Sequence, residues 1–185
     1  MTNNNISSKA ISSLENEQVA GHNPIDTSTI SSPKRYVLLI VVGIFIILFD
    51  QISKIWVETN ISTYRPVKIL GDFVRLILAH NYGIIWGIPI RSPLVYYILP
   101  LIGIIVVLYL ALKTRIKFLT IAFGLIIGGA VGNLIDRVRL GYVIDFIDMG
   151  IKNLRWPTYN IADAAIDIGL VMIIAREIFK SKPKP

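Results

Sequence analysis

The amino-acid sequence predicts an α-helical membrane protein with four transmembrane helices. A small extracytoplasmic β-sheet is expected between the first and second spans. Hydrophobic residues make up 54% of the 185 residues and charged residues only 17%, whereas about 25% of a soluble domain is charged. Four apolar segments, at 36–57, 93–112, 118–135 and 161–179, are each close to the roughly 20 residues that a helix needs to cross a bilayer.

The first span follows a polar segment. Residues 1–35 are rich in Asn, Ser and Thr and have no apolar period, which predicts a disordered tail. Lys34 and Arg35 before an uncharged run also resemble a signal peptide. That run leads into Asp50 rather than a small-residue cleavage site, so we expect an uncleaved span over 36–57. Asp50 and Lys54 share a helix face there, as an ion pair at the membrane interface or as part of a site.

The segment 58–92 is predicted to be an extracytoplasmic insertion. Short β-leaning runs around 67–78 are broken by Gly71 and Asp72, a turn signal. His80 has no second His or Cys at ligand spacing, so we interpret it as an interfacial or hydrogen-bonded histidine and expect no metal. The chain has no cysteine, which excludes disulfides, thiolate catalysis and Cys-based metal sites.

The remaining spans show where helices pack and how the chain is oriented. Small residues four apart in the third span favour close helix approach; they are Gly124, Gly128, Gly129 and Gly132. Cations crowd the short connection at 113–117, and basic residues mark cytoplasmic loops. We therefore expect both termini, including the basic tail 180–185, in the cytoplasm and 58–92 and 136–160 outside. The net charge of +7 is expected to contact membrane lipids and not nucleic acid.

Polar residues are concentrated between 128 and 169. A charged side chain in the bilayer costs at least about 2.5–3.5 kcal/mol, so each needs a partner, an aqueous cavity or a chemical role. The sequence has no GxSxG, HExxH or glycine-rich phosphate loop. Paired carboxylates can hydrolyse a peptide bond, because one stays protonated while its partner ionises. The candidate acids are Asp136, Asp145, Asp148, Asp163 and Asp167.

Spacing alone leaves the catalytic pair open. Asp163 and Asp167 lie four apart on one helix face, while Asn160 and Asp163 lie three apart at the helix start, where Asp163 would also suit a helix cap. Arg137 shares a face with Asn133 and is a candidate to neutralise an aspartate. Asp136 and Asp148 are expected to be solvated or paired with cations from the same loop, namely Arg137, Arg139 or Lys152.

A different class of function remains open from composition. A small transporter or proton-conducting bundle would use acids spread through the bilayer depth. Here the acids gather near one membrane face, with Asp167 the one placed well inside, and this favours hydrolysis. Presenilin-like and prepilin-type aspartyl proteases carry a GxGD motif, which the chain lacks.

Four ordered motifs resemble the lipoprotein signal peptidase (signal peptidase II) family over residues 36–178. They are Asp50-Gln-x-x-Lys54, Asn81-x-Gly83, Gly-Gly-Ala-x-Gly-Asn133-x-x-Asp136-Arg137 running into Gly-Tyr-Val-x-Asp145-Phe, and Tyr-Asn160-x-Ala-Asp163. The resemblance implies a four-span aspartyl endopeptidase of the bacterial inner membrane, with a short helix next to the small extracytoplasmic sheet in 58–92. Its reaction would remove the signal peptide of a prolipoprotein just before a diacylglyceryl-modified cysteine.

Carried over residue by residue, the resemblance makes Asp145 and Asp163 the catalytic pair near the outer face. It also implies lipidated prolipoproteins as partners, no cofactor and a monomer. The polar tail is longer than in that pattern, and Asp167 is an additional acid one turn beyond Asp163. The residues implied to surround the substrate and the pair are Asp50, Asn81, Asn133, Arg137 and Asn160.

Overall fold

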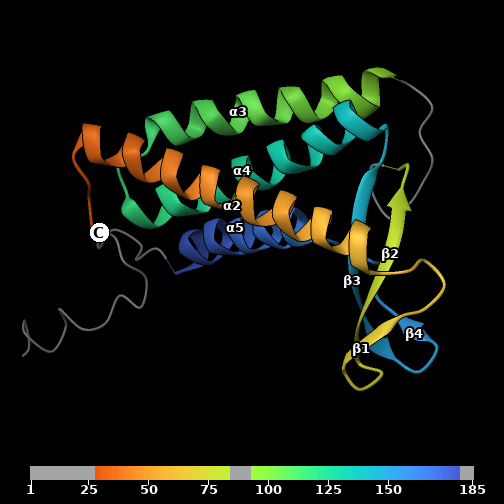
Figure 1. Ribbon diagram of the computed structural model, residues 1–185. Helices are drawn as coiled ribbons and strands as arrows, with labels where there is room; N and C mark the ends of the chain where they lie inside the picture. Colours follow the sequence, from red (N-terminus) through yellow and green to blue (C-terminus); the bar gives the residue numbers. More distant parts are fainter. Residues whose placement is uncertain (1–27, 84–92, 180–185) are drawn as a thin grey trace, which may run out of the picture.

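The computed structural model describes residues 28–83 and 93–179, which form a helical bundle with a small sheet across one end (Figure 1). Residues 1–27 and 180–185 of the predicted tails, and 84–92 of the predicted insertion, lie outside the described residues. The helices are α2 (Ser32–Asn60), η1 (Leu94–Ile98) continuing into α3 (Leu99–Lys113), α4 (Lys117–Leu140) and α5 (Ile161–Ile178).

Helix α2 begins at Ser32, four residues before the predicted start of the span. Pro33 lies in its first turn, where a residue without a backbone N–H loses no helical hydrogen bond. The residues just before the helix pair with the α3–α4 turn, since Ile30 N donates to Arg115 O at 2.9 Å. Arg35 Nη1 also donates to Thr114 O, at 2.7 Å. The start of α2 is therefore fixed beside that turn.

Three helices in the described part of the chain are long and apolar enough to cross a membrane. They are Ser32–Asn60, Leu94–Lys113 and Lys117–Leu140. Many apolar side chains of α2 and α3 are exposed, as expected for surfaces that face lipid rather than water. Helix α5 matches the predicted fourth span in position but carries four charged residues in its 18, namely Asp163, Asp167, Arg176 and Glu177.

The glycines of α4 bring it close to two neighbouring helices, which confirms the predicted close approach. A Cβ atom at Gly128 would lie 2.8 Å from the backbone oxygen of Gly43 on α2, and a Cβ at Gly129 would clash with the backbone oxygen of Ala162 on α5. Both distances are shorter than van der Waals contact. Helix α4 therefore packs backbone to backbone between α2 and α5.

The sheet differs from the prediction, because only half of it comes from the segment 58–92. Strands β1 (Val67–Leu70) and β2 (Val74–Asn81) lie in that segment, whereas β3 (Val143–Ile151) and β4 (Leu154–Arg155) come from the second polar loop. All neighbours in the order β1-β2-β3-β4 are antiparallel. Acids interrupt the apolar pattern of β3, which hides it in the sequence. Residues 61–83 contain no short helix.

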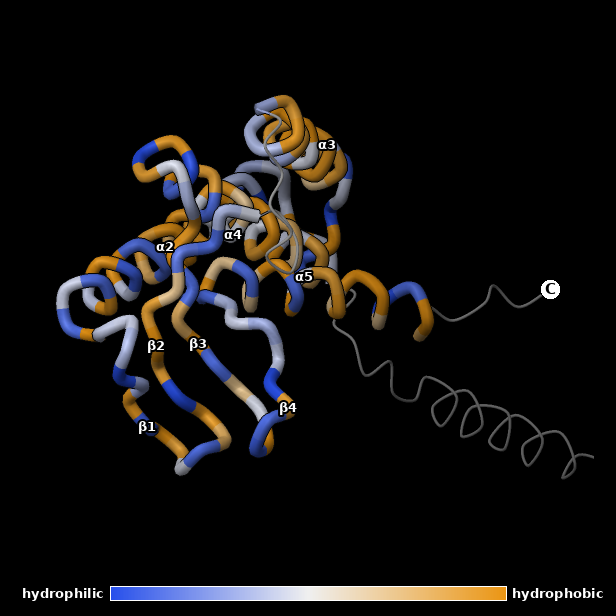
Figure 2. Tube along the Cα trace, turned by 90° about the vertical axis from the view of Figure 1, so that its right-hand side faces the viewer, coloured by the Kyte–Doolittle hydropathy of each residue, from blue (hydrophilic) through white to orange (hydrophobic). Residues whose placement is uncertain are grey.

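The sheet and the bundle meet at one end of the molecule. Figure 1 shows the strands running crosswise to the helices there, with the start of α2 and the α3–α4 turn at the opposite end. A buried cluster joins the end of α2 to β3 and consists of Val57, Ile61, Ile144 and Phe146. Figure 2 shows long apolar stretches on the helices and more hydrophilic residues in the sheet.

Candidate active site

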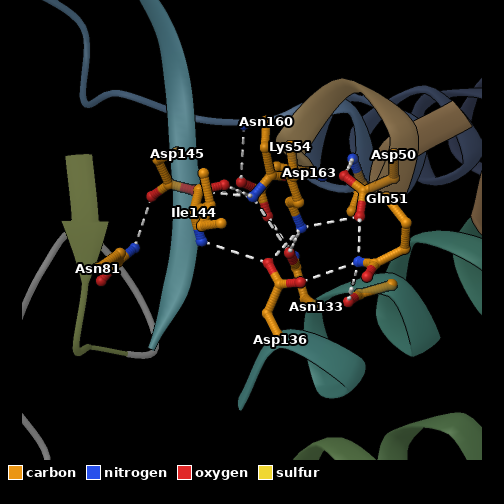
Figure 3. Close-up of polar contacts among 12 residues, drawn as sticks. Asp50, Gln51, Lys54, Asn81, Asn133, Asp136, Ile144, Asp145, Asn160 and Asp163 are labelled. Carbon is orange, nitrogen blue, oxygen red and sulfur yellow. Dashed lines mark hydrogen bonds and ion pairs between the residues drawn. The ribbon is translucent and has the colours of Figure 1, made fainter. Parts of the chain in front are cut away.

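A network of polar side chains lies where β3 meets the ends of α2, α4 and α5 (Figure 3). It draws residues from five elements that are far apart in the sequence. They are Asp50, Gln51 and Lys54 on α2, Asn81 on β2, Asn133 and Asp136 on α4, Asp145 on β3, and Asn160 and Asp163 at the start of α5. Six of the seven residues that the sequence placed in the site belong to this network.

Asp145 is buried on β3, with 3% of its surface exposed. Its Oδ1 accepts a hydrogen bond from Asn160 Nδ2 at 2.7 Å, and its Oδ2 accepts one from Asn81 Nδ2 at 2.8 Å. The sheet register explains the second contact, because Ala79 and Asn81 on β2 lie opposite Asp145 and Val143 on β3. Two amide groups from separate elements thus fix the orientation of this carboxyl.

Asp163 is held from two sides as well. Its Oδ1 accepts from Asn133 Nδ2 at 2.7 Å, and its Oδ2 accepts from the backbone N–H of Asn160 at 3.2 Å. Asn160 Oδ1 in return accepts from Asp163 N at 2.9 Å, so the two residues form a capping box at the start of α5. The helix cap suggested by the sequence is present, and the same carboxyl also faces the network.

Asn160 connects the two acids. It is fully buried and uses its side chain for Asp145 and its backbone for Asp163. Burial raises the pKa of the Asp145 carboxyl to about 7, and the nearby charge of Asp163 adds to the increase. Near neutral pH this arrangement favours a single proton on the pair of carboxyl groups.

A buried ion cluster supports this pair. Lys54 Nζ lies 2.8 Å from an oxygen of Asp50 and 2.8 Å from an oxygen of Asp136, and it donates to Asn133 Oδ1 at 3.0 Å. Because Lys54 occupies the amide oxygen of Asn133, the amide nitrogen points to Asp163. Asp50 and Lys54 thus form the ion pair that their spacing allows, and both side chains are buried.

Asp136 was expected to be solvated or paired with Arg137, Arg139 or Lys152, and this expectation was wrong. It is 1% exposed, pairs with Lys54, and accepts from Gln51 Nε2 at 2.9 Å and from the backbone N–H of Ile144 at 3.2 Å. Its spacing of three from Asn133 places both on one face of α4. That spacing was the available signal, but the partners come from α2 and β3.

Asp148 also has other partners than expected. It lies on β3 and binds Arg75 on β2 and Arg155 on β4, not the predicted Arg137, Arg139 or Lys152. Burial opposes its ionisation, but the hydrogen bonds from Arg155 and Arg75 outweigh burial and hold the pKa of Asp148 below its usual range. This acid therefore ties three strands together.

Arg137 is the predicted site residue that lies apart from the network. It is buried at the end of α4, and its guanidinium lies over the ring of Tyr96, 5.1 Å from the centroid. Within residues 28–83 and 93–179 Arg137 forms no ion pair. It therefore does not neutralise an aspartate of this part of the chain, as the sequence had suggested it would. A cation over an aromatic ring gains electrostatic stabilisation instead.

Asp167 does not join Asp163 in these hydrogen bonds. It is exposed on α5 and lines a cavity beside β3 and β4, which argues against the alternative pairing of these two acids.

His80 lies against the ring of Tyr142, with centroids 4.3 Å apart. No group of His, Asp and Glu side chains among the described residues is arranged to hold a metal ion.

The chain is similar to known proteins in both sequence and structure. A family model described as signal peptidase (SPase) II matches residues 42–179. The lipoprotein signal peptidase of Syntrophus aciditrophicus (strain SB) is 32% identical over 82% of this chain and 98% of its own length. That of Francisella tularensis subsp. novicida (strain U112) is 38% identical over 77% and 92%. A solved structure of a bacterial membrane enzyme, 30% identical, has a TM-score of 0.71 over 80% of this chain and 93% of that one.

Proposed function

The chain belongs to the signal peptidase II family and removes signal peptides from prolipoproteins, and we propose that it does so as an aspartyl endopeptidase with Asp145 and Asp163 as its catalytic pair. The observation that carries the proposal is their common attachment to Asn160, which binds one carboxyl through its side chain and the other through its backbone. Paired carboxyls joined in this way provide an acid and a base at one site.

The first step of the proposed reaction is attack by water. The ionised carboxyl of the pair takes a proton from a water molecule while the protonated carboxyl donates to the oxygen of the scissile carbonyl. The water oxygen bonds to the carbonyl carbon, which becomes tetrahedral. Support comes from the pKa of Asp145, about 7, because a shared proton at neutral pH is what this step requires.

The second step breaks the peptide bond. The carboxyl that received the proton from water gives it to the leaving nitrogen, the C–N bond breaks, and the carbonyl forms again as the hydroxyl proton returns to the other carboxyl. The signal peptide leaves with a new carboxylate and the mature protein with a new amine. The pair ends with the same single proton with which it began.

The asparagines and the buried ion cluster hold the pair in place. Asn81, Asn133 and Asn160 donate to the two carboxyls, and each bonded oxygen keeps a further lone pair for water or substrate. Lys54 donates to Asn133 and so fixes its side chain. Asp50 and Asp136 in turn hold Lys54 in position. We assign Arg137, beside Tyr96, to the wall that meets the substrate.

We further propose that α5 is a fourth span, so that residues 36–179 form one peptidase domain with both termini in the cytoplasm. The site would then lie at the outer face of a bacterial inner membrane, in a monomer surrounded by lipid. Support comes from the basic residues at the end opposite the sheet, where Arg35 contacts the α3–α4 turn, and from a network built within one chain.

Single cysteines test this topology, since the natural chain has none. Cysteines at Ser62 and Lys152 should react with an impermeant thiol reagent in intact cells, because both residues are exposed at the sheet end. A cysteine at Thr114, in the α3–α4 turn, should react only after the cells are opened. Labelling at Thr114 alone in intact cells would reverse the orientation.

The proposed substrate class is tested with two precursors that differ in one group. Purified enzyme is incubated with a diacylglyceryl-modified prolipoprotein and with the same precursor lacking the lipid. Because each buried methylene contributes about 0.8 kcal/mol, two acyl chains can provide most of the affinity, and we expect cleavage of the lipidated precursor at least about a hundredfold faster. Equal cleavage of both precursors would contradict the proposed dependence on lipid.

A further inference from the structure

A cavity of about 720 Å³ lies beside the candidate active site, between the β3–β4 hairpin and α5. It belongs to the size range of small-ligand pockets, which are mostly apolar with a few polar groups. Its walls include Met149 and Trp156 on the sheet side and Ile168 on α5, with Asp167 and Arg155 as its charged residues. None of these residues belongs to the network around Asp145 and Asp163.

Two elements, β3 and α5, carry both a member of the catalytic pair and residues of the cavity wall. On β3, Asp145 and Met149 are four residues apart, so both point to the same face at a separation of about 13 Å. On α5, Asp163 and Asp167 are also four apart, about 6 Å along the helix axis. A substrate group attached near the scissile bond can therefore reach the cavity.

The cavity walls suit a hydrocarbon chain better than a peptide. Two backbone N–H groups of the sheet wall are already paired, since Gly150 N donates to Phe73 O and Trp156 N donates to Met149 O. The guanidinium of Arg155 is taken up by Asp148 and by carbonyl oxygens. Apart from the carboxylate of Asp167, a peptide would find few partners for its own N–H and C=O groups here, whereas an acyl chain needs none.

The surface around the cavity leads toward lipid. Ile168 is 55% exposed, and Val171 and Ile174 further along α5 are exposed as well. In Figure 1 the sheet extends past α5 at the end of the bundle, with β4 in the part that lies beyond it. A hydrocarbon chain lying along α5 would have one end in the cavity and the other in the membrane.

We propose that this cavity binds one acyl chain of the substrate's diacylglyceryl group. The inference rests on the proposed function and assigns it a lipid subsite. Binding there would place the modified cysteine beside Asp145 and Asp163 and would leave the second chain outside the cavity. The bound acyl chain should contribute to substrate affinity and not to the chemical step.

The test compares two precursor peptides that differ only in acyl length, dipalmitoyl and dibutyryl, with the purified full chain in detergent. Ile168→Trp fills the cavity, and Ile174→Trp adds the same side chain on α5 outside it. We expect Ile168→Trp to raise KM for the dipalmitoyl peptide about tenfold more than for the dibutyryl peptide, with kcat for the long-chain peptide within about twofold of wild type. Ile174→Trp should show no such selectivity.

Equal losses on both peptides, or no loss on either, would overturn the acyl subsite while leaving the proposed function intact. Failure of the wild-type enzyme to cleave either peptide would instead contradict the proposed function. If Ile168→Trp does not fold, Trp156→Ala removes part of the opposite wall and should show the same selectivity for chain length. A cavity variant that only loses co-purifying phospholipid, with KM unchanged, would assign the cavity to bilayer lipid and overturn the proposal.

Discussion

Asn in place of Asp145 or of Asp163 is expected to lower cleavage of a lipidated prolipoprotein by several orders of magnitude, as loss of one member of a catalytic unit does. The substitution keeps the size of the side chain but removes the base and the shared proton. Each variant should still accumulate in the membrane at wild-type levels. Cleavage rates under single-turnover conditions, measured alongside protein amount, provide the check.

Asp167→Asn is the matched control for this loss. Asp167 is on the same helix as Asp163, but it is exposed and lines the neighbouring cavity. We expect its rate to stay within about tenfold of wild type, since it touches neither carboxyl of the pair. Inactive Asp167→Asn together with active Asp145→Asn would move the catalytic pair to Asp163 and Asp167.

Lys54→Met is expected to cause the largest loss of stability. Lys54 is 1% exposed and pairs with both Asp50 and Asp136, so its removal leaves two buried carboxylates without their cation. Breaking a buried ion pair from one side costs about 3–5 kcal/mol. Asn133 would also lose the contact that orients it toward Asp163, so activity should fall in the protein that remains folded.

Lys68→Met serves as the control, because Lys68 also pairs with an aspartate four residues away, Asp72. Both side chains of that pair are mostly exposed, so water replaces the lost contact. Thermal unfolding in detergent should show a clear decrease in Tm for Lys54→Met and almost none for Lys68→Met. Similar Tm values for both variants would mean that the buried cluster contributes no more than a surface pair.

Local spacing explains what the sequence could predict. Asp50 and Lys54 are four apart on a helix, and their pairing follows from helix geometry alone. The glycines of α4 predicted close packing for the same reason, because a small residue allows approach whichever helix arrives. The start of α5 was also predictable, since Asn160 and Asp163 have the spacing of a capping box.

Contacts between distant segments explain what the sequence could not predict. Strand β3 carries Asp145 and Asp148 among apolar residues, so the alternation that would indicate a strand is obscured in the sequence. The partners of Asp136 and Asp148 depend on how β3 is aligned with β2 and on where α2 ends. Arg137 points to Tyr96 because η1 packs against the end of α4, a contact that no local spacing encodes.

The pH dependence of single-turnover cleavage by the wild-type enzyme tests the central claim most directly. One shared proton is needed, so the rate should fall at acid pH, where both carboxyls are protonated, and fall again as pH rises through the value of about 7 for Asp145, where the pair loses that proton. Both losses should reverse on return to neutral pH. A rate that keeps rising into the alkaline range would contradict a carboxyl pair and indicate a nucleophile activated by deprotonation.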